Sequence, residues 1–353
     1  MQVAALLGAV LISASSAAHI DVVRISLAQL YLGAEVAGIV RIDSVEDHDF
    51  SHGGPPALRE VLSATMLHQY KGEPRQHVHF FLDAHGPADY RAGDLAALFL
   101  EATDPADPLH QLSPEGPEVF VSRQVRNTEH RLTVDEVEDY RRVLGTYATP
   151  RWGGKQTKPA VSETLLYMLA SGSISLAQSA LIDWQNLGAA VDFSETQIDA
   201  LTGLTRSAEC PIHLRLSILK TLTAQKLVAQ TAWDPLFESE DGDNLLALVR
   251  ATRGREHKHF QPYLVRALGS DSLVLSGAAA RALAHPTYAG VEPLLETLLR
   301  DDDLRLNYAA ISGLLGIGSP AADAMLRQAA ESHASKRVRR MVTARLRASL
   351  DRG

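Results

Sequence analysis

The sequence predicts a two-domain protein in which a small N-terminal β-barrel precedes a C-terminal, all-α solenoid. Two observations support this prediction. The C-terminal third repeats a helical apolar pattern with a period of about 32 residues, whereas the first 147 residues contain short β-branched runs separated by glycine and proline turns. The chain has 353 residues, which is enough for two domains of ordinary size.

The expected elements of the first domain follow one another closely. Ser26 is placed to cap a short helix. Thr133 and Glu136 fit a capping box and predict a helix to about residue 147 that closes the domain. Between them, runs rich in β-branched or alternating apolar residues predict strands at residues 35–45, 58–70, 76–82, 95–100 and 118–122.

A connector rich in proline and glycine at residues 148–160 separates the two domains. From residue 161 to residue 353, short breaks separate one predicted helix from the next. Within the repeat, apolar residues four positions apart share one helix face, which stacking must bury. These trios are Val274, Ala278 and Ala282, then Leu306, Ala310 and Leu314, then Val338, Val342 and Leu346.

Residues 1–18 form an apolar run that ends in small residues, a pattern that predicts a signal peptide. We therefore expect export to the periplasm or the cell exterior, although the run contains no lysine or arginine. A buried N-terminal helix or a misassigned start codon is the alternative, with a cytoplasmic protein as its consequence. No other segment approaches the roughly 20 apolar residues of a membrane span, so no transmembrane segment is expected after signal removal.

Three segments of the first domain, SLAQLYLGAEVAGIVRIDSV, LHQYKGE and YRAGDLAALFL, resemble the N-terminal OB-like barrel of bacterial exported proteins of unassigned function. HEAT repeats often follow the barrel in those proteins. The segment DDDLRLNYAAISGLLGIGSPAADAMLRQAA likewise resembles a HEAT-like repeat of the type found in bilin lyases, but no residue matches a pigment site. The resemblance implies an OB-like domain at residues 19–147, a HEAT-like solenoid at residues 161–353, and no catalytic residues.

Histidines give the clearest chemical signal, because the first domain holds more than half of the 14 in the chain. His77 and His79 are two apart on a predicted strand, so their rings share a face and can bind zinc or copper with a neighbour such as Asp83. Cleavage after Ala18 would also expose His19, whose amine and ring together can chelate copper. A solvated sheet face is the alternative interpretation of His77 and His79.

Charge is distributed unevenly along the chain. The formal net charge of −8 argues against a nucleic-acid partner. The aspartates at 301–303 complement the dipole of the helix that follows them, with calcium binding as the alternative. The last predicted helix is strongly basic, mostly because a terminal repeat needs a polar outer face. The alternative is that it binds an acidic protein partner or an anionic membrane or polymer surface. Its candidate binding residues are Lys336, Arg337, Arg339 and Arg340.

The chain lacks a recognisable nucleophile, phosphate-loop or dinucleotide motif, and it predicts no cofactor. Its single cysteine, Cys210, allows no internal disulfide. We therefore expect a non-enzymatic interaction or scaffold protein that binds a protein or polymer through its solenoid. A metal-binding protein, or a hydrolytic enzyme that uses the barrel histidines, is the alternative. A barrel with a free N-terminus also resembles the tissue metalloproteinase inhibitors, but those domains are disulfide-bonded.

Overall fold

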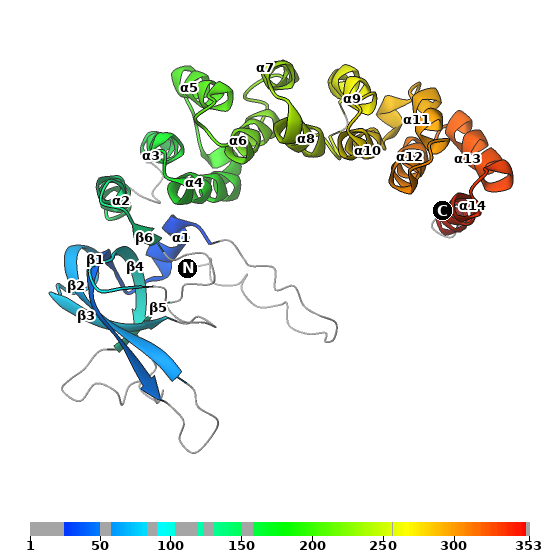
Figure 1. Ribbon diagram of the computed structural model, residues 1–353. Coiled ribbons are helices and arrows are strands. Elements are labelled where there is room, and N and C mark those ends of the chain that lie inside the picture. The colour runs from blue at the N-terminus through cyan, green and yellow to red at the C-terminus, as the bar shows by residue number, and fades with distance from the viewer. Residues whose placement is uncertain are drawn as a thin grey trace. The chain divides into compact units, whose positions relative to one another are not determined.

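A computed structural model of the protein divides the chain into two compact units (Figure 1). The first unit comprises Met1–Thr164 with Ser173–Asp183, and the second comprises Leu165–Gly172 with Trp184–Gly353. Most of the predicted linker at residues 148–160 lies outside the described residues. A sheet in the first unit and an all-α second unit confirm the predicted division into strand-rich and helical parts. The structure describes residues 25–49, 58–82, 90–102, 119–122, 130–149, 158–255 and 257–350.

Six strands of the first unit form one mostly antiparallel sheet. Across it the order is β1-β2-β3-β5-β4-β6, and β1 also pairs with β4. Among the strand pairs of the described residues, only β3 and β5 run parallel to each other. Five of the strands confirm predicted segments, while β6 was missed because three residues are too short to show an alternating pattern. The strands are β1 (Val36–Asp49), β2 (Leu58–Lys71), β3 (His77–Leu82), β4 (Leu95–Ala102), β5 (Val119–Ser122) and β6 (His130–Leu132).

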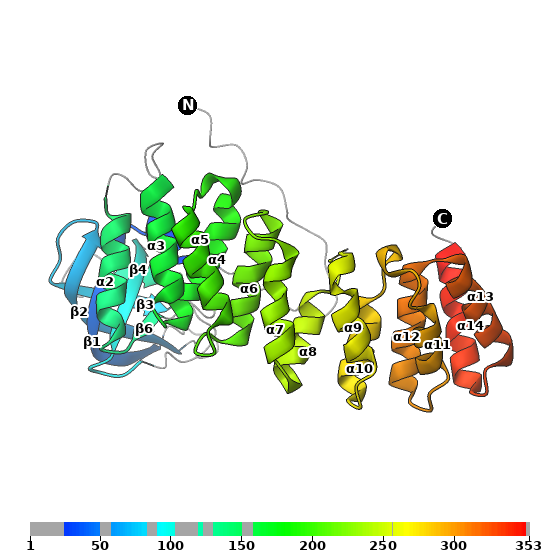
Figure 2. The same ribbon diagram turned by 90° about the horizontal axis from the view of Figure 1, so that it is seen from above.

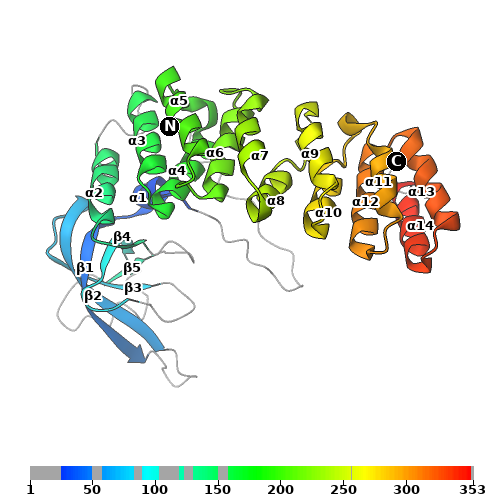
Figure 3. The same ribbon diagram turned by 45° about the horizontal axis from the view of Figure 1, so that its top comes forward.

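The strands of the first unit lie together in Figure 3, and buried and exposed residues alternate along β3. On β3, Val78 and Phe80 enter the core, whereas His77 and His79 point to the other face and are exposed. The buried cluster of the sheet consists of Val36, Val40, Ile42, Leu62, Ala64, Val78, Phe80, Tyr90, Ala96, Leu98, Leu100 and Phe120.

Helices border this sheet, and side chains from α4 hold the first turn of α1. The amide of Leu27 donates to Ser179 Oγ at 2.5 Å. The Asp183 carboxylate accepts from the Ser26 hydroxyl and from the amide of Ala28. Ser26 also caps α1, as predicted. Because α4 satisfies free amides of α1, its residues up to Asp183 belong to the first unit. The helices named here are α1 (Leu27–Gly33), α2 (Glu136–Tyr147), α3 (Lys158–Ala170) and α4 (Ile174–Leu187).

The predicted capping box at the start of α2 is also confirmed. The Glu136 carboxylate accepts from the amide and the hydroxyl of Thr133, at 3.0 and 3.1 Å. Its other oxygen accepts from the Ser173 hydroxyl at 2.8 Å. The cap therefore fixes the start of α2 and ties it to the residue that precedes α4.

In the second unit, successive helices alternate between two rows (Figure 1). Figure 2 shows the helices of the two rows side by side. One row contains α5 (Glu195–Arg206), α7 (Asp234–Ser239), α9 (Gln261–Leu268), α11 (Glu292–Leu299) and α13 (Pro320–Ser332). The other row, here called the second row, contains α6 (Ile212–Ala224), α8 (Gly242–Ala251), α10 (Leu273–Ala282), α12 (Leu304–Ile317) and α14 (Lys336–Leu350). Short 3₁₀ turns occur at η2 (Gly188–Ala190), η3 (Gln230–Trp233), η4 (Lys258–Phe260) and η5 (Pro286–Tyr288).

The repeat differs from the predicted one in one register. Val274 is 52% exposed, so it does not belong to the buried face of α10. The N-cap Asp303 of α12 follows the N-cap Ser272 of α10 by 31 positions, whereas Ser335, which caps α14, follows Asp303 by 32. The positions equivalent to the buried trios of α12 and α14 are therefore Leu275, Ala279 and Leu283, the residue after α10, one position later than expected. The predicted Ala278 and Ala282 are buried as well, so only Val274 of the predicted trio is wrong.

Glycine and alanine bring the helices of the second row close together. A Cβ atom added at Gly313 of α12 would lie 2.8 Å from the Ala280 carbonyl oxygen of α10. One added at Gly316 would lie 2.4 Å from the Ala284 carbonyl oxygen. Both distances are shorter than real Cβ contacts, so α12 can take this position only if these residues have no side chain.

Candidate binding surface

The histidines predicted to bind metal share a face of β3 but have polar neighbours rather than further ligands. His79 Nδ1 lies 2.8 Å from Ser63 Oγ, and His77 Nδ1 lies 3.5 Å from Thr65 Oγ1. Thr65 in turn donates to Asp43 at 2.6 Å. Within the described ranges, no three His, Cys, Asp or Glu side chains gather around a common point. His19 and Asp83 lie outside the described residues.

The contact between Ser63 and His79 has the residue types of a hydrolytic pair but lacks its supporting groups. His79 is exposed and Ser63 is half-buried. Asp43, the carboxylate nearest in the network, is engaged with Thr65 and with Arg41 at 3.5 Å, rather than with His79. A nucleophilic serine needs a base that a third group orients, so the described contacts do not favour catalysis here.

Two buried titratable groups of the first unit are held by structural contacts. His130 is almost fully buried, with Nδ1 2.8 Å from the Tyr140 hydroxyl and its ring edge-on to Phe99 and Tyr140. Burial lowers the pKa of His130 to about 4, so the ring is neutral at pH 7. Burial raises the pKa of Asp183 to about 6, although the hydrogen bonds from Ser26 and Ala28 act to lower it.

The basic residues predicted to bind a partner divide into two groups. Lys336, Arg337 and Arg340 are exposed. Arg339 instead points back to the preceding turn, where its guanidinium donates to the carbonyls of His333 and Ala334. Arg339 therefore helps to hold the turn in place, and the sequence alone did not distinguish it from its neighbours.

Arg339 occupies a position that is polar in the three last second-row helices. Asn307 of α12, four residues after its cap, donates to the carbonyls of Leu299 and Asp301, both at 2.9 Å. Ser276 of α10 donates to the Leu268 carbonyl at 2.7 Å. In each repeat this side chain satisfies carbonyls that end the preceding helix, and so fastens one helix to the next.

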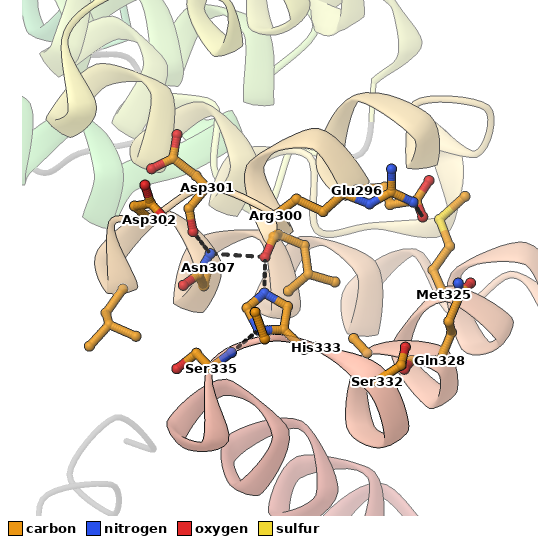
Figure 4. A pocket seen from close by; sticks show the side chains of 14 residues that line it. Glu296, Arg300, Asp301, Asp302, Asn307, Met325, Gln328, Ser332, His333 and Ser335 are labelled. Carbon is orange, nitrogen blue, oxygen red and sulfur yellow. Dashed lines mark hydrogen bonds and ion pairs between the residues drawn. The ribbon is translucent and has the colours of Figure 1, made fainter.

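A cavity of about 500 Å³ lies between the turn from α11 to α12 and the turn from α13 to α14 (Figure 4). His333 is one of the residues that line it. His333 Nδ1 accepts from the Ser335 amide at 3.0 Å, and Nε2 lies 2.8 Å from the Leu299 carbonyl, which can only accept. The proton therefore sits on Nε2, and both ring nitrogens are engaged. With Asn307, this ring joins two neighbouring turns, which is a structural role.

The arginines at the start of α12 and at the end of α11 form ion pairs with carboxylates, whereas those of α14 form none with the residues that the structure describes. Arg300 contacts Glu296 at 2.5 Å, and Arg305 contacts its own N-cap residue Asp303 at 2.7 Å. In α14 the cap is a serine, and the helix contains no acidic residue. Across the parts of the chain that the structure describes, no carboxylate pairs with the exposed basic residues of α14. These residues, here called the basic face, are Lys336, Arg337, Arg340, Arg345 and Arg347.

Tyr308 joins the basic face to the exposed side of α12. Its ring is 40% exposed, and the guanidinium of Arg345 lies 5.3 Å from the ring centroid and also donates to the Tyr308 hydroxyl. Sequence reasoning missed Tyr308, although its place outside the buried trio of α12 was a usable signal. An exposed aromatic ring beside arginines is a common feature of binding surfaces.

The sequence profile of the HEAT repeats family matches residues 261–347, which span most of α9 to α14. This part of the chain is thus similar to HEAT repeats, as predicted, and such repeats form helical scaffolds for protein interactions. No curated protein matches the chain. Among the described residues, no helix is both long enough and apolar enough to span a membrane.

The two buried groups predict how the stability of the first unit responds to pH. Asp183 binds a proton more tightly when folded, so its contribution falls as pH rises from about 4 to about 6. His130 binds a proton less tightly when folded, so its contribution falls as pH drops from 6.5 to about 4. The two effects oppose each other between pH 4 and 6. The Glu136 carboxylate, which accepts from Thr133 and Ser173, opposes the lowering of the pKa of His130.

Asp183→Asn removes the contribution of Asp183 to the pH dependence and leaves that of His130. We expect the variant to lose about 3 kcal/mol of stability between pH 6.5 and 4, while the wild type changes much less over the same range. Amide hydrogen exchange of β1 and β4 at a series of pH values measures this difference. Parallel pH profiles of the two proteins would contradict a protonated, buried Asp183.

Proposed function

We propose that the protein is a non-enzymatic scaffold that binds a protein partner through the second-row helices of its C-terminal repeats. The observation that carries this proposal is the basic face of α14, whose exposed side chains have no carboxylate partner among the described residues. Unpaired arginines beside an exposed tyrosine form a surface that an acidic partner would complement.

The remaining polar groups support a scaffold better than an enzyme. Asn307, His333 and Arg339 are engaged in fastening turns, and His130 and Asp183 are buried within the first unit. The exposed His77 and His79 would need ligands from outside the described ranges to hold a metal. The metal-binding and hydrolytic alternatives therefore have less support than binding through the repeats.

Site-specific photo-crosslinking tests the scaffold proposal. A photoreactive amino acid replaces Tyr308 of α12 in the full chain, and in a control it replaces Leu294 of α11, which is 43% exposed on the other row. In cells of the source organism, we expect one defined protein to be cross-linked from position 308 and not from position 294. Cross-linking of the same proteins from both positions, or of none from position 308, would contradict the proposal.

The fold of the first unit is proposed to be an OB-like barrel. The proposal is supported by the succession of pairings from β1 through β2, β3, β5 and β4 back to β1, and by the parallel pair of β3 and β5. The pairing of Ile39 with Ala97 is the contact on which closure depends. Absence of an amide contact between these two residues in solution would argue for an open sheet.

Export of the protein is proposed on the apolar run at residues 1–18. These residues and His19 lie outside the described part of the structure. Mass spectrometry of the protein from its native cells is expected to find a mature chain that begins near Ala18 or His19. A chain that retains residues 1–18 would overturn the proposal and favour the cytoplasm.

A further inference from the structure

We propose that the partner of the second row is a short polypeptide segment with an apolar half and an acidic half, which crosses the first turns of α10, α12 and α14 in that order. This inference rests on the proposed function and deepens it. It names the chemistry of the partner and the direction in which that chemistry changes along the surface.

Equivalent positions of the three helices change from apolar to basic. The first two residues of α10 are Leu273 and Val274, and both are exposed. In α12 the same positions hold the exposed Leu304 and then Arg305. In α14 they hold Lys336 and Arg337. The surface along these first turns is therefore apolar at one end and positively charged at the other.

Ion pairing within α12 increases the difference in charge between the first turns of α12 and α14. Arg305 is neutralised by Asp303, the residue that also caps its helix. Arg337 follows a serine cap, so the charge at the equivalent position of α14 remains available. Positive charge without a carboxylate partner among the described residues is thus concentrated on α14, while the first two residues of α10 are apolar. A partner gains most if its acidic residues lie on α14 and its apolar residues lie on α10.

The spacing of the helices sets the length of the segment. Packed helices lie about 8–10 Å apart, so the two steps from α10 to α14 cover roughly 16–20 Å. An extended chain spans this distance with about five or six residues at ~3.3 Å each. Exposed Leu273 and Val274 also favour a polypeptide over a uniformly charged polymer, because such a polymer has no apolar part to bury there.

The test uses the full chain and labelled twelve-residue peptides of one composition, made of leucine, valine and glutamate. In two of them the apolar half and the acidic half are separate, in either chain direction, and in a third the residues are shuffled. A twelve-residue oligoglutamate completes the set. Fluorescence anisotropy is expected to show at least threefold tighter binding of one segmented peptide than of the shuffled peptide or oligoglutamate.

Two double variants with the same loss of charge locate the site. Arg337→Gln with Arg340→Gln removes unpaired arginines, and we expect it to weaken binding of the segmented peptide about three- to tenfold. Arg300→Gln with Arg305→Gln removes arginines that already have carboxylate partners, and we expect less than a twofold change. Equal weakening by both variants would overturn the inference, because net charge alone would then explain binding.

Three other outcomes also overturn the inference. They are equal affinity for segmented and shuffled peptides, equal affinity for oligoglutamate, and no binding of any peptide. None of them removes the proposed function if cross-linking from position 308 still captures one defined protein. Failure of that cross-linking, by contrast, removes the proposed function itself, so the two failures are distinguishable.

Discussion

The arrangement of the C-terminal repeats depends on how closely α12 lies against α10. Gly313 and Gly316 face backbone carbonyls of α10 and the turn after it, at distances that leave no room for a side chain. This close approach sets the spacing of α10 and α12. It thereby brings the first turns of successive helices close enough to form one surface.

Polar side chains then divide between holding this arrangement and remaining free. Ser276, Asn307 and Arg339 stand at equivalent positions, and each satisfies carbonyls of the preceding helix or turn. Arg337, two residues before Arg339, is exposed and makes no such contact with the described residues. An arginine side chain thus has a structural role at position 339 and is available for a partner at position 337. The difference depends on which groups the fold places beside each position. The first unit follows a similar rule, since Asp183 serves α1 rather than a ligand.

Local patterns predicted much of this structure, and long-range contacts account for what they missed. Strands β1 to β5 and the caps at Ser26 and Glu136 were predictable because alternation and capping depend on neighbouring residues. The register of α10 could not be predicted, because Val274 and Leu275 are both apolar. A change of one residue in the repeat length therefore leaves the apolar pattern unchanged. The roles of Arg339 and Tyr308 depend on contacts with other helices, which spacing in the sequence does not reveal.

The most direct test of the close approach compares two glycine substitutions in helices of the second unit. Gly316→Ala would place a Cβ atom 2.4 Å from a backbone oxygen, whereas Gly203→Ala in α5 would meet nothing within 4 Å. Measured by urea unfolding of the full chain, Gly316→Ala is expected to lower the free energy of unfolding by about 1–3 kcal/mol. Gly203→Ala is expected to raise it by about 0.5–1 kcal/mol. If Gly316→Ala stabilises the protein as much as Gly203→Ala, the helices are not in close contact and the account is wrong.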